Sequence, residues 1–225
     1  ISKTEKPTIN SYTHEKDTNK EIIPTLNTLT LSRQVRTLIC HQMQDPLSQP
    51  IINLDSDDKL RISFDDLDAD IKNYYFTIIH CNVDWTRSDL IESEYIHGFY
   101  EEYIKDHEFS YNTIQRYTHY SFEFPSKTIK PLLSGNYVFK IFEEGKDPIA
   151  YQRFMVLDTK TSIEPTIKRA TLAKYRNIKH EIDFIIKTPE LETSNPYSEI
   201  QVVVTQNNRL DNSLTELKPV FIKND

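Results

Sequence analysis

Residues Lys59 to Phe99, KLRISFDDLDADIKNYYFTIIHCNVDWTRSDLIESEYIHGF, contain two strongly patterned segments joined by an acidic turn, and they decide the fold class. In the first segment Leu60, Ile62 and Phe64 alternate with polar residues, which is the two-residue period of a half-buried strand. The second segment, Tyr74 to Cys81, is apolar or aromatic at nearly every position. Because this pattern is typical of a strand covered on both faces, we expect the segment in the middle of a sheet.

Further strand patterns on both sides of this stretch indicate an all-β fold. Residues 34–43 carry apolar side chains on both faces, as in a buried strand, and alternating strands follow at 117–124 and 137–141. Short strands separated by turns, with almost no helical period, predict an antiparallel β-sandwich of immunoglobulin or fibronectin type. Tyr137, close after Gly135, is typical of a tyrosine corner.

The sequence divides into three parts. Residues 1–30 lack a sustained apolar period, so we expect an N-terminal tail or leader. Residues 31–158 are predicted to form the first β-sandwich domain. Residues 159–225 are fewer than the roughly 100 of a complete sandwich, so we expect the start of a second, incomplete β domain. Its predicted strands are Thr166 to Arg169, Ile182 to Lys187, Ile200 to Thr205 and Val220 to Lys223.

Composition excludes two classes of partner. Lys and Arg total 27 against 34 Asp and Glu, and the formal net charge of −7 repels phosphate backbones, so we expect no nucleic acid partner. No stretch approaches the roughly 20 apolar residues that span a bilayer, so we expect no direct membrane insertion. The sequence does not indicate an oligomeric state.

The two cysteines leave two alternatives open. Cys40 and Cys81 could form one disulfide in an oxidising compartment, or they could be two buried thiols.

The acidic residues near the turn invite a calcium site, but their spacing does not support one. An EF-hand count that starts at Asp66 places Ile71 where Gly is required and Thr77 where Glu is required. We favour a solvated turn with no metal, and calcium is the weaker alternative. His80 and Cys81 are adjacent on a strand and point to opposite faces, so they cannot readily chelate one ion. The acidic residues are Asp55, Asp57, Asp58, Asp65, Asp66, Asp68 and Asp70.

Motifs of catalysis are missing from the sequence. It contains no G-x-S-x-G elbow, no phosphate-cradling loop and no H-E-x-x-H, and only three glycines could build tight catalytic turns. We therefore predict no catalytic residues, no cofactor and no enzymatic activity. A hydrolase assembled from dispersed His and Asp is a weaker hypothesis, which would require these groups to converge in a cleft.

Aromatic residues crowd the region after the central strand. Tyr and Trp are preferred anchors of protein interfaces and of sugar-stacking platforms, although such residues can also cover the ends of a core. We expect Phe109 and Tyr120 in the core. The residues predicted to lie at the surface and bind a partner are Trp85, Tyr95, Phe99, Tyr100 and Tyr103.

The order of several motifs between residues 34 and 223 resembles the plug protein family of the type IX secretion system. One departure is the segment Asn207 to Leu210, where a Gly-Arg-Trp type of turn is expected. The motifs are SFDDLDADIKNYYFTIIHCNVDW (63–85), SEYIHGF (93–99), FSYNTIQRYTHYSFEFP (109–125), LSGNYVFKIFEEG (133–145) and VVVTQNNRLDNSLTELKPVFI (202–222).

This resemblance implies a non-enzymatic protein of the periplasm, at the inner face of the outer membrane. It would bind the periplasmic end of the outer-membrane translocon barrel of this secretion system and seal its pore. Family members run well beyond residue 225, which agrees with an incomplete second domain. The alternative is an immunoglobulin-like module that uses the same tyrosines to recognise a glycan or a secreted protein, since sandwich folds host both functions.

Overall fold

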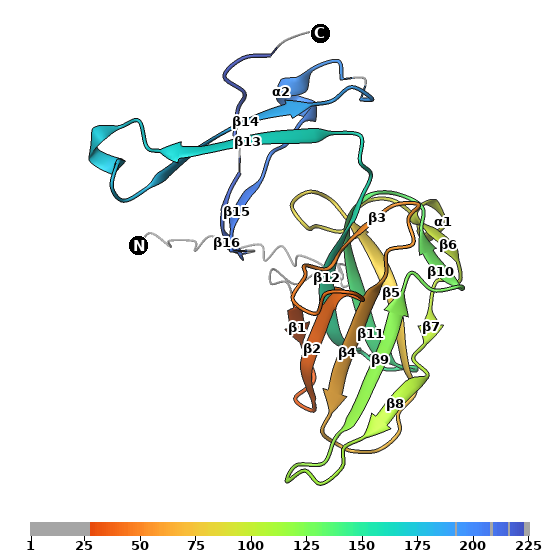
Figure 1. The fold of residues 1–225 in the computed structure, drawn as a ribbon. Coiled ribbons are helices and arrows are strands. Elements are labelled where there is room, and N and C mark those ends of the chain that lie inside the picture. The colour runs from red at the N-terminus through yellow and green to blue at the C-terminus, as the bar shows by residue number, and fades with distance from the viewer. Residues whose placement is uncertain (1–27, 192, 208, 216, 223–225) are drawn as a thin grey trace, which may run out of the picture.

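The computed structural model describes residues 28–222, apart from residues 192, 208 and 216, and its main body is a sandwich of two β-sheets (Figure 1). The larger sheet has the order β1-β12-β11-β5-β7, and β3 pairs with β12. Its strands are β1 (Thr28–Thr30), β3 (Ile51–Asn53), β5 (Tyr74–Cys81), β7 (Glu102–Tyr103), β11 (Gly135–Glu143) and β12 (Pro148–Leu157). The facing sheet has the order β2-β4-β9-β8. Its strands are β2 (Val35–Gln42), β4 (Leu60–Asp66), β8 (Asp106–Phe109) and β9 (Thr118–Phe124).

Pairing within the sandwich confirms the predicted antiparallel fold. Every strand pair is antiparallel except β3 with β12. Within the segment predicted as an N-terminal tail or leader, Thr28–Thr30 forms strand β1 at the edge of the larger sheet. The remainder of that predicted segment, residues 1–27, lies outside the described residues. A short helix α1 (Glu92–Tyr95) and the pair β6 (Ile96–Gly98) and β10 (Ile129–Pro131) cover one side.

The two segments that decided the fold class form β4 and β5. The side chains of β4 alternate between buried and less buried positions, as the two-residue period predicts. Strand β5 is interior to its sheet, since β11 pairs with it along its whole length and β7 pairs with Tyr75 and Phe76. Both faces of β5 carry buried residues, because Ile78 points into the sandwich while Ile79 and Cys81 belong to a separate cluster on the outer face.

Aromatic rings from both sheets fill the sandwich core. Phe139 of β11 stacks on Phe154 of β12 with ring centroids 4.1 Å apart, and its edge meets Phe124 of β9 at 5.0 Å. Phe76 of β5 stacks on Phe122 of β9 at 4.1 Å, so the two sheets interlock through their rings. The predicted tyrosine corner is present, because the hydroxyl of buried Tyr137 donates to the carbonyl oxygen of Leu133 at 2.8 Å.

Strand β2 differs from the predicted buried strand. Thr37 has a left-handed backbone with φ of 55°, and the pairing with β4 shifts register between Arg36 and Ile39. This β-bulge turns both Val35 and Leu38 toward the core and leaves Ile39 45% exposed. Because β2 is an edge strand of its sheet, its outer residues meet solvent.

Both cysteines are free thiols. Cys40 lies on β2 and packs against the core between the sheets, while Cys81 belongs to the cluster on the outer face of the larger sheet. Burial raises the pKa of the Cys81 thiol to about 12. The alternative of two thiols therefore describes this structure, and the disulfide alternative does not.

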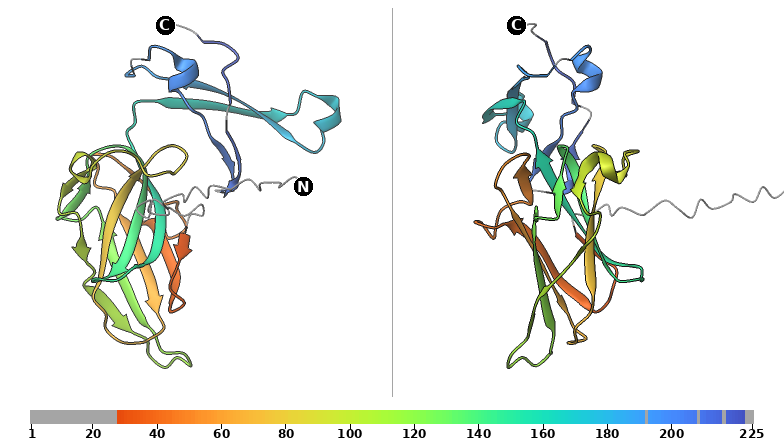
Figure 2. Two further views of the ribbon diagram at one scale, coloured as in Figure 1. Left: turned by 180° about the vertical axis from the view of Figure 1, so that it is seen from behind. Right: turned by 90° about the vertical axis from the view of Figure 1, so that its right-hand side faces the viewer.

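Residues after β12 form two separate two-stranded ribbons (Figure 2). The predicted strands at 166–169 and 182–187 lie within β13 and β14, but only the end of the strand predicted at 200–205 forms part of β15. The strand predicted at 220–223 is wrong for the described residues 220–222. The elements are β13 (Ser162–Arg169), η1 (Ala173–Tyr175), β14 (His180–Lys187), α2 (Pro196–Glu199), β15 (Val204–Gln206) and β16 (Arg209–Leu214).

The β13–β14 ribbon has one apolar and one charged face. Residues directly opposite each other in an antiparallel pair share a face. The apolar face carries the pairs Ile163 with Ile186, Pro165 with Phe184 and Ile167 with Ile182. The other face carries the ion pairs Lys168–Glu181, Lys168–Asp183 and Lys187–Glu164. Ile167 is 67% exposed, so the apolar face is open to solvent in the described structure.

Candidate functional site

The predicted partner-binding residues do not form one exposed patch. Phe99 and Tyr100 are exposed, whereas Tyr103 is half-buried beside Tyr75. Tyr95 is only 2% exposed, so the prediction that it lies at the surface is wrong. Helix α1 packs Tyr95 against the sandwich, with its ring centroid 6.1 Å from that of Tyr137.

Trp85, the remaining predicted surface residue, covers the outer face of the larger sheet. It packs against the cluster of Ile79, Cys81, Val138 and Tyr151. The guanidinium carbon of Arg153 lies 4.3 Å from the centroid of its ring, a cation–π contact that holds the indole in place. Trp85 is therefore half-buried and has a structural role.

Two of the predicted residues do come together in a groove beside β5. Tyr95 and Tyr100 line a hollow of about 270 Å³. Its other walls are Thr77, Ile78, Ile79, Arg87, Glu92, Glu101 and Lys140. Arg87 and Glu92 form an ion pair of 2.9 Å, so part of the charge in the groove is internally compensated.

His80 occupies a half-buried position between the rings of Tyr95 and Tyr137. Its Nδ1 lies 2.9 Å from Oγ of Ser88. Burial lowers the pKa of His80, and a backbone hydrogen bond at Ser134 partly offsets this effect. The imidazole is therefore packed against two aromatic rings of the sandwich.

The lowered pKa of His80 predicts a pH dependence of stability. Its ordinary pKa is 6.5, so below that pH the unfolded chain binds a proton that the folded chain resists. The free energy of unfolding should therefore fall as the pH drops below about 6.5, toward the lower pKa that His80 has in the folded protein. Urea denaturation between pH 5 and 8 should show a weaker pH dependence for His80→Gln than for the native protein. His97→Gln, at an exposed position, is the control. If the free energy of unfolding depends on pH equally in all three proteins, His80 is not the source of the pH dependence.

The acidic turn between β4 and β5 contains a lysine whose ammonium group pairs with the aspartates of the same turn. Nζ of Lys72 lies 2.8 Å from Oδ2 of the fully buried Asp66 and also contacts the carboxylates of Asp68 and Asp70. The hydroxyl of Tyr74 donates to the same Oδ2 of Asp66 at 2.8 Å. Three aspartates considered for calcium are thus gathered around an ammonium group. Among the described residues, no group of three or more His, Cys, Asp and Glu side chains is arranged so that it could hold a metal ion.

Hydrogen bonds fix this turn onto β9. The backbone N–H of Lys72 donates to the hydroxyl of Tyr120 at 2.8 Å, and Oγ1 of Thr118 donates to the carbonyl of Asp70 at 2.8 Å. Tyr120 is completely buried, as predicted, and its ring stacks on Phe64. The turn is therefore a rigid support for the loop that precedes β9.

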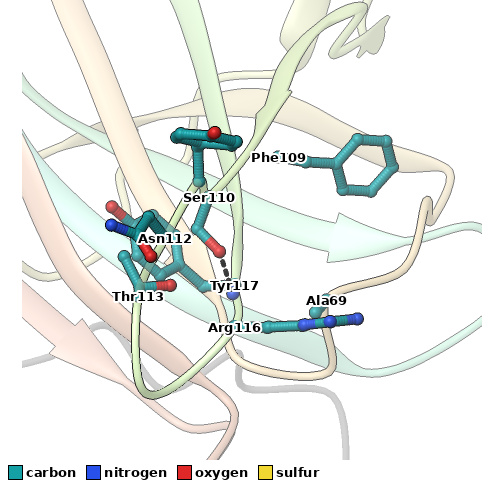
Figure 3. Close-up of a pocket in the computed structure, with 8 residues that line it drawn as sticks. Ala69, Phe109, Ser110, Asn112, Thr113, Arg116 and Tyr117 are labelled. Atoms are coloured by element: carbon teal, nitrogen blue, oxygen red, sulfur yellow. Dashed lines mark hydrogen bonds between the residues drawn. The ribbon is translucent and has the colours of Figure 1, made fainter.

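That loop, residues 110–117, borders a hollow of about 530 Å³ at the end of the sandwich (Figure 3). We call residues 110–117 the distal loop. Phe109 was expected in the core but is 58% exposed, because it lies at the end of edge strand β8 and lines this hollow. The remaining lining residues are Ala69, Ser110, Tyr111, Asn112, Thr113, Arg116 and Tyr117.

The distal loop presents large apolar side chains to solvent. Tyr111 is 93% exposed and Ile114 is fully exposed. We did not select these residues from the sequence. The available signal was an aromatic and an aliphatic side chain inside a polar turn, Ser-Tyr-Asn-Thr-Ile, where turn residues are normally polar.

A family model now decides the relationship of the chain. The model of the type 9 secretion system plug protein, first domain, matches residues 35–158, which is more than half of the chain. The chain belongs to the type 9 secretion system plug protein family. The match runs from the start of β2 to the residue after β12, so it holds every strand of the sandwich except β1. No curated protein matches this plug-family chain significantly.

One solved structure is similar to this plug-family chain over most of its length. It is a hypothetical protein from Parabacteroides merdae ATCC 43184, with a TM-score of 0.82 and 28% sequence identity. The alignment covers 87% of this chain and 50% of the other, so the plug-family chain spans half the length of that structure. A match to the Pseudomonas fluorescens DNA glycosylase AlkC, with 9% identity, 59% and 31% coverage and a TM-score of 0.30, is too weak to indicate a shared fold.

Proposed function

We propose that this protein is a periplasmic plug of the type IX secretion system. It binds the periplasmic end of the outer-membrane translocon barrel and seals the pore when no substrate is passing. The family match over residues 35–158, which hold every strand of the sandwich except β1, is the observation that carries this proposal. The role is non-enzymatic, since sealing a pore requires a shape-complementary surface and no reactive group. Among the described residues no helix is long and apolar enough to cross a membrane.

The structure offers physical support for a sealing role. The sandwich core is filled by stacked aromatic rings from both sheets, so the body that would face the pore is rigid. A stable contact with a barrel should bury at least about 1,000 Å² and centre on a few aromatic anchors.

Affinity isolation tests the proposed function. Tagged intact protein, isolated from detergent-extracted outer membranes, should recover the translocon barrel as its main partner. Deletion of the gene should make the outer membrane permeable to a hydrophilic dye that normal porins exclude, because an unsealed pore would remain. Recovery without the barrel, together with unchanged permeability, would rule out the plug role.

A glycan-binding or protein-binding module is the second candidate. The groove beside β5 favours it, because Tyr95 and Tyr100 line that groove together with the charged Glu101 and Lys140, as in many sugar sites. Binding to a glycan array that is lost in Tyr100→Ala, with no barrel recovered from membranes, would support the module over the plug.

A further inference from the structure

We propose that the distal loop, with Phe109 at its base, is the surface through which the protein contacts its barrel partner. We further propose that the partner presents an apolar recess bordered by a carboxylate. This inference rests on the proposed function and specifies the site that performs it. It differs from the predicted surface, in which Trp85 is half-buried and Tyr95 fully buried while Phe99 and Tyr100 are exposed.

Exposure of the loop side chains is the first observation. The fold does not require Tyr111 and Ile114 at these positions, because neither belongs to the hydrophobic core, and both are almost entirely in solvent. Single exposed apolar residues are common, but Phe109 and Tyr111 are both exposed and line the same hollow, so they form a local apolar surface, and Ile114 lies on the same loop. Such surfaces, rimmed by polar groups, mark sites of protein association.

The loop is held in shape before any partner arrives. The backbone N–H of Ser110 donates to the carbonyl of Tyr117 at 2.9 Å, and the N–H of Tyr117 donates to Oγ of Ser110 at 3.0 Å. Nε2 of Gln115 donates to the carbonyl of Leu67 in the acidic turn at 3.3 Å. Figure 3 shows the bond between Ser110 and Tyr117 closing the base of the loop. Because less conformational freedom remains to be lost, binding by this loop costs less entropy.

Charge indicates the chemistry of the partner. Arg116 is the only charged residue in the distal loop, whereas the chain as a whole carries a net charge of −7. Within the described residues Arg116 forms no ion pair, and its nearest acidic turn already surrounds Lys72. Figure 3 shows Arg116 extending beside Ala69, on the side of the loop where Phe109 lies. A guanidinium beside aromatic rings is the composition of interface hot spots, and a carboxylate is its best partner.

Topology makes this end of the sandwich accessible. Strand β12 begins at the end that carries the distal loop and finishes at the other end, where β13 follows. The ribbons therefore leave the sandwich away from the distal loop (Figure 1). A partner can approach the loop without displacing them.

Binding of purified translocon barrel to the intact protein tests the proposal. Two variants, Tyr111→Ala/Ile114→Ala and Arg116→Glu, should each raise the Kd about tenfold or more, as hot-spot residues do. The charge reversal should also weaken the salt dependence of binding. Leu47→Ala, which removes a 94% exposed side chain at the opposite end of the sandwich, should leave the Kd within twofold of the native value.

The outcomes separate this inference from the proposed function. Native binding by both distal-loop variants would overturn the inference and leave the plug role standing. Failure of the native protein to bind the barrel would overturn both. A photo-crosslinking side chain at Tyr111 provides a second measurement that does not depend on how the substitutions fold. Cross-links to the barrel would support the proposal, and their absence in an assembled complex would overturn it.

Discussion

Replacement of Lys72 by Met is expected to lower the free energy of unfolding by about 3–5 kcal/mol, the usual cost of removing one partner from a buried ion pair. Asp66 is completely buried, and Lys72 supplies the cation closest to its carboxylate. Burial by itself would lower the pKa of Lys72, but hydrogen bonds to Asp66 and Asp68 outweigh it and raise that pKa. The ammonium is therefore charged across the physiological range, and Met would leave a buried carboxylate uncompensated. Urea denaturation at pH 7 measures the loss.

A second substitution tests whether the loss comes from the carboxylate. In Lys72→Met/Asp66→Asn the buried charge is absent, so a substantial part of the lost stability should return. The matched control is Lys146→Met, since Lys146 forms an exposed ion pair with Glu143 that is expected to contribute about 0–1 kcal/mol. A loss below about 1 kcal/mol in Lys72→Met would show that Asp66 does not depend on this cation.

Truncation of Phe139 to Ala is expected to destabilise the protein by about 3–5 kcal/mol. Phe139 is completely buried, and its ring meets those of Phe76, Phe122, Phe124 and Phe154. Alanine would leave a cavity between the two sheets, because the surrounding rings come from different strands and cannot all collapse into it. The free energy of unfolding from denaturant titration gives the direct comparison with the native chain.

Phe142 is the matched control on the same strand. Its ring lies on the outer face of the larger sheet, half-buried against Tyr75 at 6.1 Å. Phe142→Ala should therefore cost clearly less than Phe139→Ala. Equal costs would mean that the centre of the core does not lie at Phe139.

Local patterning was sufficient to predict the sandwich. Leu60, Ile62 and Phe64 alternate in the sequence because one face of β4 is buried, and the apolar run of β5 reflects burial on both of its faces. Tyr137 could be predicted because a tyrosine corner depends on a short-range hydrogen bond. Each of these features depends only on residues that are close together in the sequence.

Features that depend on distant contacts were not predictable in the same way. The bulge at Thr37 changes which residues of β2 face the core, and nothing in the local sequence specifies it. Tyr95 is buried because α1 folds back onto the sandwich, and Phe109 is exposed because its strand extends to the end of the core. The surface around Trp85 was chosen from aromatic density, which cannot distinguish a ring at an interface from a ring that covers a sheet.

The division into domains stays a proposal. We propose that the ribbons after β12 belong to a second β domain, because a two-stranded ribbon with one apolar face is marginally stable without a covering layer. The open apolar face of β13–β14 is consistent with that view.

Because Lys72 is part of the chain, the acidic turn does not need a dissolved cation to balance its carboxylates. A carboxylate cluster that depends on a dissolved ion changes shape with the supply of that ion, whereas an ammonium attached to the same chain cannot diffuse away. The acidic turn that supports the distal loop thus carries a counter-ion of fixed stoichiometry. We therefore expect chelators, or changes in divalent cation concentration, to leave that support unchanged.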